Sequence, residues 1–256
     1  MRRVIAFPCA GDRLVATLDQ AAGTSGLLIV SGGNEIRAGA HRGMGSLAAA
    51  IAHHGYPVFR YDRRGIGDSS GTNAGFLSAR DDLIAAATAF RTASPALTRI
   101  MGFGNCDAAS TLALFGQDAG IDRVLLANPW TQDERDDLPP RAVIRARYAA
   151  RIRQPREWRR LLTGGVRLSW LIRGLRKLST KSSEDLATRV LTGIARWGAD
   201  ASILLAAGDA TAIAFAAAAR KSDLVIATQT IASDSHSFAN EVDREALQAA
   251  VRRLLA

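Results

Sequence analysis

Short apolar runs alternate with amphipathic segments along most of the chain, and this alternation predicts strands separated by helices. The runs that predict strands are Leu14–Leu18, Gly26–Val30, Val58–Tyr61, Thr98–Phe103, Arg123–Ala127, Ala201–Ala206 and Leu224–Gln229. The segments that predict helices are Met44–His54, Ala79–Thr92, Ala108–Phe115 and Val242–Leu255. Residues 1–10 predict one more strand, which forms a hairpin with Leu14–Leu18 around Gly11-Asp12.

Strands that alternate with helices form a mostly parallel sheet with helices on both faces. The region of about 131–192 has no strand signal and predicts a helical insertion that caps one edge of the sheet. Because there is no repeat or low-complexity linker, we expect residues 1–256 to form a single α/β domain that includes this cap. Ligands in such folds bind outside the carboxyl ends of the strands, so residues just after strands are the candidates for chemistry.

Bulk composition narrows the function classes. Of 256 residues, 48% are apolar, which is enough for a sizeable core, and no apolar run reaches the roughly 18 residues of a membrane span. The apolar start is too short for a signal peptide and is interrupted by Pro8. The two cysteines, Cys9 and Cys106, and the four histidines do not form a disulfide framework or a structural zinc pattern. We therefore expect a cytoplasmic protein without a metal or another cofactor.

The basic character of the chain is local. Arg141–Lys177 holds 12 Lys/Arg and one acid, a net +11, so the remainder of a chain with net charge +9 sums to −2. This segment fits a solvated helical face. Its interleaved apolar residues, Trp158 and Trp170 among them, equally suit an anionic surface of the inner membrane, an acidic polysaccharide, or a phosphorylated or carrier-bound acyl donor. Nucleic acid is not expected, since no recognition motif accompanies the charge.

Gly104-Asn105-Cys106-Asp107-Ala108 lies between a predicted strand and a predicted helix. It is a variant of the G-x-S-x-G nucleophile elbow of α/β hydrolases, in which a sharp turn exposes the nucleophile. The residues two before and two after the nucleophile must be small so that strand and helix do not collide, and Gly104 and Ala108 are small. A helix N-terminus also favours a thiolate. The pattern predicts Cys106 as a nucleophile.

Other interpretations of this segment remain open. A free cysteine is often a buried structural residue, which is our interpretation of Cys9. Ser110 is a second candidate nucleophile, but it lies one turn into the predicted helix and lacks small neighbours on both sides. We therefore expect Cys106, rather than Ser110, to react.

The chain order nucleophile, acid, histidine of this fold indicates the other two catalytic groups. His236 follows the last predicted strand, and Asp209 follows the one before it. A histidine with a near-neutral pKa can take the thiol proton and later activate water, while the carboxylate orients it. A solvated loop histidine is the alternative for His236. Other candidate acids, each explained more simply as a cap or turn residue, are Asp200, Asp223 and Asp234.

Acyl transfer also needs N–H donors aimed at the developing oxyanion. The backbone N–H of Asp107 is one candidate, and the loop after Gly26–Val30 supplies the other, from Gly33 or Asn34. A simple tight turn would also explain the two glycines of this loop. His41 follows in the same loop and is a candidate for lining the substrate site, whereas His53 and His54 fit a helix end at the surface.

Further motifs carry a family resemblance. Tyr61–Ser69 resembles the D-x-R-G-x-G-x-S loop found across α/β hydrolases, and we expect its charged residues to be structural ion partners. Together with Gly104–Asp107, Gly39–Arg42 and 153–162, this loop is similar to the exosortase A system-associated hydrolases, type 1, over nearly the whole chain. The resemblance implies an α/β-hydrolase fold with a helical cap and a gene in a bacterial exopolysaccharide and exosortase locus. Two departures are Ala108, where glycine is expected, and the alanine-rich 207–219.

Two functions from different classes follow from these residues. The first is a cysteine hydrolase that cleaves a small-molecule ester or thioester through an acyl-enzyme, or transfers the acyl group to a sugar hydroxyl. The second is a non-catalytic member of the fold that acts as a binding or scaffold protein at a membrane-associated polysaccharide complex. The reactivity of the Cys106 thiolate separates these two functions.

Overall fold

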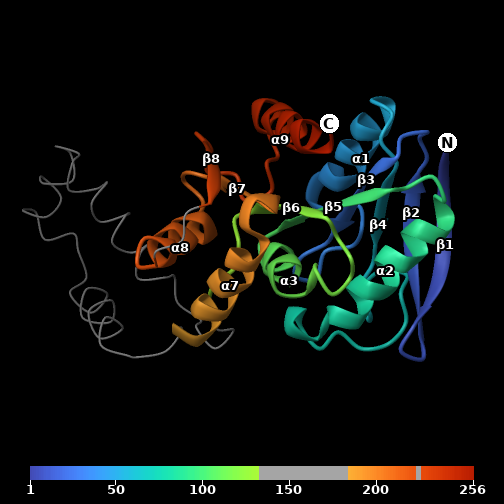
Figure 1. The fold of residues 1–256 in the computed structure, drawn as a ribbon, viewed down its shortest axis with the longest axis horizontal. Coiled ribbons are helices and arrows are strands. Elements are labelled where there is room, and N and C mark those ends of the chain that lie inside the picture. Colours follow the sequence, from blue (N-terminus) through green and yellow to red (C-terminus); the bar gives the residue numbers. More distant parts are fainter. Residues whose placement is uncertain (133–183, 223–225) are drawn as a thin grey trace, which may run out of the picture.

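The structure is a computed structural model that describes residues 1–132, 184–222 and 226–256, and its centre is an eight-stranded sheet (Figure 1). In chain order the strands are β1 (Arg2–Cys9), β2 (Asp12–Asp19), β3 (Ser25–Val30), β4 (Val58–Tyr61), β5 (Arg99–Asn105), β6 (Arg123–Ala127), β7 (Ala201–Ala206) and β8 (Ala227–Ile231). Their spatial order is β1-β2-β4-β3-β5-β6-β7-β8. β2 is antiparallel to β1 and β4, and all other neighbouring pairs are parallel.

Helices cover both faces of the sheet (Figure 1). On one face, α1 (Gly43–His53) and α9 (Glu241–Leu255) bury their apolar side chains against the sheet. The other face is covered by α2 (Arg80–Ala93), α3 (Asp107–Phe115), α7 (Glu184–Trp197) and α8 (Ala210–Ala219). The two apolar clusters on either side of the sheet explain why the central strands are buried on both faces and have almost continuous apolar sequences.

The order of the strands reverses beside β3. The chain passes from β3 to β4 on one side and then crosses to β5 on the other side. At such a reversal the loops that leave the two strands diverge and open a crevice at their carboxyl ends. The loop after β3, which begins at Ser31, and the turn after β5, which contains Cys106, therefore lie next to each other.

Most of the predicted elements are confirmed. The bounds of β4, β6 and β7 are those expected from their apolar runs, and the N-terminal hairpin is present. β8 lies later than predicted, at Ala227–Ile231 instead of Leu224–Gln229, and 223–225 are outside the described residues. α8 was not predicted, because its alanine-rich sequence has no polar face and therefore no helical periodicity.

Of the predicted cap at about 131–192, the structure describes Thr131, Gln132 and the part from Glu184, where α7 begins. α7 packs closely on α3, since a Cβ on Gly193 would lie 2.8 Å from the Ala113 carbonyl oxygen, and the Trp197 indole donates to the same oxygen at 3.3 Å. Residues 133–183, which include the basic segment Arg141–Lys177, lie outside the described residues. In the part of the chain that the structure describes, no helix is both long and apolar enough to cross a membrane.

Candidate active site

Cys106 forms the turn between β5 and α3. Its backbone has φ 61° and ψ −126°, a region that side-chain-bearing residues seldom adopt. Such strained residues persist where the surrounding structure holds them, and they cluster at functional sites. Here the hydrogen bonds between β5 and β6 continue into the turn, because the Cys106 amide donates to the Ala127 carbonyl at 3.0 Å. The Cys106 side chain is half-buried at the first turn of α3, where the helix amides have no intrahelical acceptor.

The expected steric limits of the turn are present. A Cβ on Gly104 would lie 2.6 Å from the carbonyl carbon of Ala108 and 2.8 Å from the amide nitrogen of Ala109. These are backbone atoms of α3, so a side chain at residue 104 would require the helix to move. Ala108 itself is fully buried, which shows that its methyl group fits where the family resemblance implies glycine.

His236 and Asp209 come together at the carboxyl ends of β7 and β8. The Nδ1 atom of His236 lies 2.9 Å from Oδ1 of Asp209. The second carboxylate oxygen of Asp209 accepts the backbone N–H of Ala212 at 3.0 Å, so Asp209 is also the N-cap of α8. The capping bond fixes one oxygen of the carboxylate and leaves the other to face the imidazole.

Both ionisable groups of this pair have shifted pKa values. The pKa of His236 is raised to about 10, first by its hydrogen bond with Asp209 and second by its interaction with the Cys106 side chain, against the opposing effect of burial. For Asp209, burial acts to raise the pKa, but the hydrogen bonds from His236 and from the Ala212 amide outweigh it, and the pKa lies below its usual value. The pKa of His236 therefore lies above the near-neutral value expected from the sequence, because the Asp209 carboxylate and the Cys106 sulfur both face the imidazole.

Asp209→Asn should lower the pKa of His236 from about 10 towards the ordinary 6.5, because the largest cause of the upward shift is the bond with Asp209. An NMR titration of the His236 ring gives the midpoint directly. The matched control is Asp234→Asn, an exposed carboxylate in the same loop, which should leave the midpoint near 10. A midpoint that stays near 10 in Asp209→Asn would assign the shift to another group.

The loop after β3 is tied to the residue that follows the nucleophile. The Gly33 N–H donates to Oδ1 of Asp107 at 2.7 Å, and the Arg63 guanidinium donates to the Gly33 carbonyl. Arg63 also lies 3.7 Å from Oδ2 of Asp107. Of the two predicted oxyanion donors in this loop, Gly33 is thus already bonded to a side chain, while Asn34 is exposed, with its side-chain oxygen bonded to Asn73 at 2.9 Å.

The D-x-R-G-x-G-x-S loop braces the same region with ion pairs. Arg37, after β3, pairs with the fully buried Asp62 and, at 2.8 Å, with Asp68. Arg64 pairs with the buried Asp82 of α2. These contacts are between protein groups and support the interpretation that the charged residues of this loop are structural.

The remaining candidates lie in different surroundings. His41 is exposed in the short 3₁₀ turn Ala40–Arg42, with a left-handed φ of 52°. Ser110 is fully buried, and its hydroxyl donates to the Trp130 carbonyl at 2.6 Å, so it has no access to a substrate. Asp200 pairs with Arg123 at the other end of the sheet, and Asp223 is outside the described residues.

Two asparagines at the site were not predicted. Asn105, the last residue of β5, donates to the His236 carbonyl at 3.0 Å. Asn128, directly after β6, donates to Oδ1 of Asn105 at 3.0 Å. Their position at strand ends was the available signal, since polar residues there lie at the ligand-binding edge.

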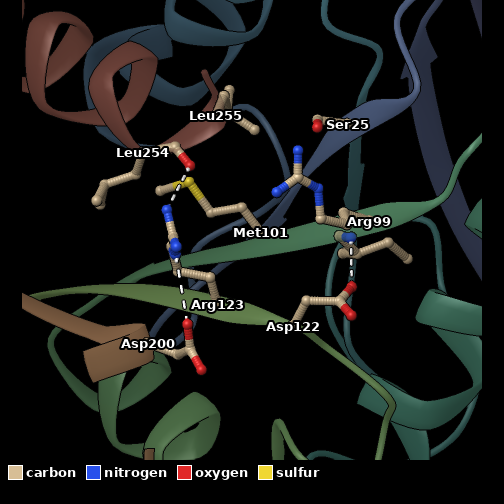
Figure 2. Close-up of a pocket in the computed structure, with 9 residues that line it drawn as sticks. Ser25, Arg99, Met101, Asp122, Arg123, Asp200, Leu254 and Leu255 are labelled. Carbon is tan, nitrogen blue, oxygen red and sulfur yellow. Dashed lines mark hydrogen bonds and ion pairs between the residues drawn. The ribbon is translucent and has the colours of Figure 1, made fainter. Parts of the chain in front are cut away.

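A separate cavity of about 130 Å³ lies at the amino ends of the strands, away from Cys106. Figure 2 shows the Arg123 guanidinium between the Asp200 carboxylate, 3.7 Å away, and the Leu254 carbonyl at 3.4 Å. Asp122 accepts the Ile100 N–H at 2.7 Å. These charged groups form their ion pair and hydrogen bonds with other protein groups, so their presence around the cavity is explained by the fold. Across the described ranges 1–132, 184–222 and 226–256, no group of three or more His, Cys, Asp or Glu is arranged to hold a metal ion.

Comparison with solved structures identifies the fold. The chain is similar to a Pyrococcus furiosus esterase, Pf2001, with 15% identity and a TM-score of 0.64 over 100% of this chain and 89% of that one. It is also similar to XC6422 of Xanthomonas campestris, described as an α/β serine hydrolase without a lid. The identity is 15% and the TM-score 0.61, over 98% of this chain and 94% of that one. A proline iminopeptidase of Mycobacterium smegmatis matches with 14% identity and a TM-score of 0.63, over 99% of this chain and 97% of that one. No family model and no curated protein matches the chain. The strand order and these similarities show that the chain has the α/β-hydrolase fold.

Proposed function

We propose that the protein is a cysteine hydrolase that cleaves a small-molecule ester or thioester through an acyl-enzyme on Cys106. The observation that carries the proposal is the strained turn that holds Cys106 at the start of α3, facing a histidine that is itself bonded to a buried carboxylate. A buried structural cysteine would need neither the strain nor the two partners.

In the first half of the reaction, the Cys106 sulfur attacks the carbonyl carbon and forms a C–S bond. The bond from that carbon to the leaving oxygen or sulfur breaks, and the leaving group takes the proton carried by His236. The raised pKa of His236 favours this role, because the imidazole holds a proton before the substrate arrives. A protonated imidazole beside a thiol also stabilises the thiolate, which is the attacking species.

In the second half, the neutral imidazole of His236 takes a proton from water, and the water oxygen attacks the acyl carbon. The C–S bond breaks and the carboxylic acid leaves. The proton stays on His236, and Cys106 is again a thiolate. If a sugar hydroxyl replaces water, the same steps transfer the acyl group instead of hydrolysing it. Asp209 holds the ring orientation through both halves.

We assign the oxyanion site to the N–H groups of Asp107 and Asn34. The amide of Asp107 is the first of α3 and has no intrahelical acceptor. Asn34 is preferred over Gly33, because the Gly33 N–H is bonded to the Asp107 carboxylate. The role of His41 in lining the substrate site stays part of the proposal and is supported by its place in the same loop and its strained backbone.

The biological setting is proposed from sequence alone. The resemblance to the exosortase A system-associated hydrolases suggests a role in a bacterial exopolysaccharide locus. The net +11 of Arg141–Lys177 suits an acidic polysaccharide or the anionic surface of the inner membrane from the cytoplasmic side. Sedimentation with anionic vesicles at low salt tests the membrane part, and absence of binding would refute it.

Brief exposure to p-nitrophenyl butyrate should add one acyl group to the wild-type protein, and intact-protein mass spectrometry should detect it. The adduct should be absent in Cys106→Ala. It should persist in Cys9→Ala, because burial, followed by the charge of Asp82, raises the pKa of the Cys9 thiol to about 11 and keeps it unreactive. No adduct in the wild type, with Cys106 also slow towards iodoacetamide, would contradict the proposal and favour a non-catalytic scaffold.

A further inference from the structure

Asn128 occupies an unusual position directly after β6. β6 lies between β5, which leads to Cys106, and β7, which leads to Asp209. Asn128 is fully buried, and its φ of 42° is in the left-handed region, where asparagine is one of the few non-glycine residues that occur. A strained, buried polar residue at the ligand-binding edge of the sheet needs an explanation in its side-chain contacts.

Every polar atom of the Asn128 side chain faces a segment of the candidate active site. Its Oδ1 accepts the Ala206 N–H at 2.9 Å. Its Nδ2 donates to Oδ1 of Asn105 at 3.0 Å and lies 3.4 Å from the His236 carbonyl oxygen. Asn105 in turn donates to the same carbonyl at 3.0 Å. A primary amide has the one acceptor and two donors that this set requires.

These contacts join the three segments that carry the proposed triad. Asn105 immediately precedes Cys106, Ala206 lies three residues before Asp209, and the third contact is with His236 itself. The backbone of Asn128 extends the ladder, because its N–H donates to the Leu204 carbonyl at 3.0 Å. The side chain adds contacts with the last residues of β5 and β7 and with the loop that carries His236.

We propose that Asn128 is a positioning residue that sets the placement of His236 relative to Cys106 and Asp209, acting through Asn105 and the His236 carbonyl. This inference rests on the proposed function only for its effect on acylation. The orientation of His236 can be measured without a substrate. Asn128 touches no reacting atom, and its effect on the reaction is indirect.

The backbone conformation suggests how to remove the side chain alone. Asn128→Gly keeps the left-handed conformation without strain and deletes all three side-chain contacts. Asn128→Asp keeps the acceptor for the Ala206 N–H but places an oxygen, in place of a donor, against Oδ1 of Asn105 and the His236 carbonyl. The matched control is Ser110→Ala, which removes another buried hydrogen bond of the same region, to the Trp130 carbonyl, without a contact to His236.

Both Asn128 variants should acylate Cys106 with p-nitrophenyl butyrate about 10- to 100-fold more slowly, since a misplacement of about 1 Å costs about 100-fold in rate. The NMR titration midpoint of His236 should also move down from about 10, as its bond with Asp209 loosens. Ser110→Ala should unfold at lower urea concentration but keep the wild-type midpoint and rate. Loss of stability alone would not move the titration midpoint of His236. The midpoint is therefore the readout that separates a positioning role from a purely structural one.

An unchanged midpoint and acylation rate in Asn128→Gly would overturn the proposal. If neither Asn128 variant folds, Asn105→Ala removes the other donor to the His236 carbonyl, and the same two readouts apply. A wild type that forms no acyl adduct, together with a shifted midpoint in Asn128→Gly, would refute the proposed function and support the positioning role. A wild type that acylates, with Asn128→Gly unchanged, would support the function and refute the positioning role.

Discussion

His236→Gln should slow the acylation of Cys106 by about 1,000-fold, in the range expected for loss of a positioned acid–base group. Glutamine can keep a hydrogen bond with Asp209 but cannot carry the proton that the raised pKa places on His236 at neutral pH. The Cys106 sulfur then loses the cation that stabilises its thiolate, and the leaving group of a less activated ester also loses its proton donor. Stopped-flow release of p-nitrophenolate from p-nitrophenyl butyrate measures the rate.

The control for this variant is His54→Gln. His54 is exposed at the C-terminal end of α1, so its replacement should leave the acylation rate within about twofold of the wild type. Alkylation of Cys106 by iodoacetamide at pH 7 should fall in His236→Gln and not in His54→Gln. Equal acylation rates in His236→Gln and the wild type would mean that Cys106 reacts without an imidazole, and the proposed triad would be wrong.

Gly104→Ala should destabilise the protein by about 3 kcal/mol, the upper part of the usual range for overpacking. The added methyl group would lie 2.6 to 2.8 Å from backbone atoms of Ala108 and Ala109, and backbone cannot rotate away as a side chain can. The smaller unfolded-state entropy of alanine offsets only about 0.4–1 kcal/mol of this cost. Urea unfolding measures the loss, and acylation should slow because α3 begins with the Asp107 amide and directly follows Cys106.

Gly102→Ala is the matched control, because Gly102 lies two residues earlier on the same strand and points to the same face. There the new methyl group meets the flexible end of Leu112, at 2.8 Å from a terminal carbon, and the side chain can rotate. We expect a loss of about 1 kcal/mol or less and a nearly normal acylation rate. Similar losses in the two variants would show that the turn tolerates a side chain at Gly104.

The sequence predicted the elements whose signals are local. Buried parallel strands such as β6 have continuous apolar runs, and their bounds follow from those runs. α8 lacks such a signal: its alanine-rich sequence shows no polar face, and only Asp209, its N-cap, marks its start. β8 is an edge strand with mostly exposed residues, so hydropathy placed its start three residues and its end two residues too early.

For the candidate site, the sequence predicted which residues meet but not how they are bonded. The small residues around Cys106 and the order of Asp209 and His236 along the chain predicted a cysteine, a carboxylate and a histidine at one edge of the sheet. The structure brings His236 to Asp209 and to Cys106. The bond between the Gly33 amide and the Asp107 carboxylate could not be predicted, because it joins residues 74 positions apart.

Most strands of the sheet, the turn at Cys106 and the identity of the candidate groups could thus be predicted from the sequence, because hydrophobic periodicity and the sterics of a tight turn act between near neighbours. The raised pKa of His236, the bond that occupies the Gly33 amide and the side-chain hydrogen bonds of Asn128 depend on the folded structure. Each of these depends on distances of about 3 Å between atoms from different strands and loops. Hydrogen bonds and pKa values change steeply over such distances, and the sequence does not specify them.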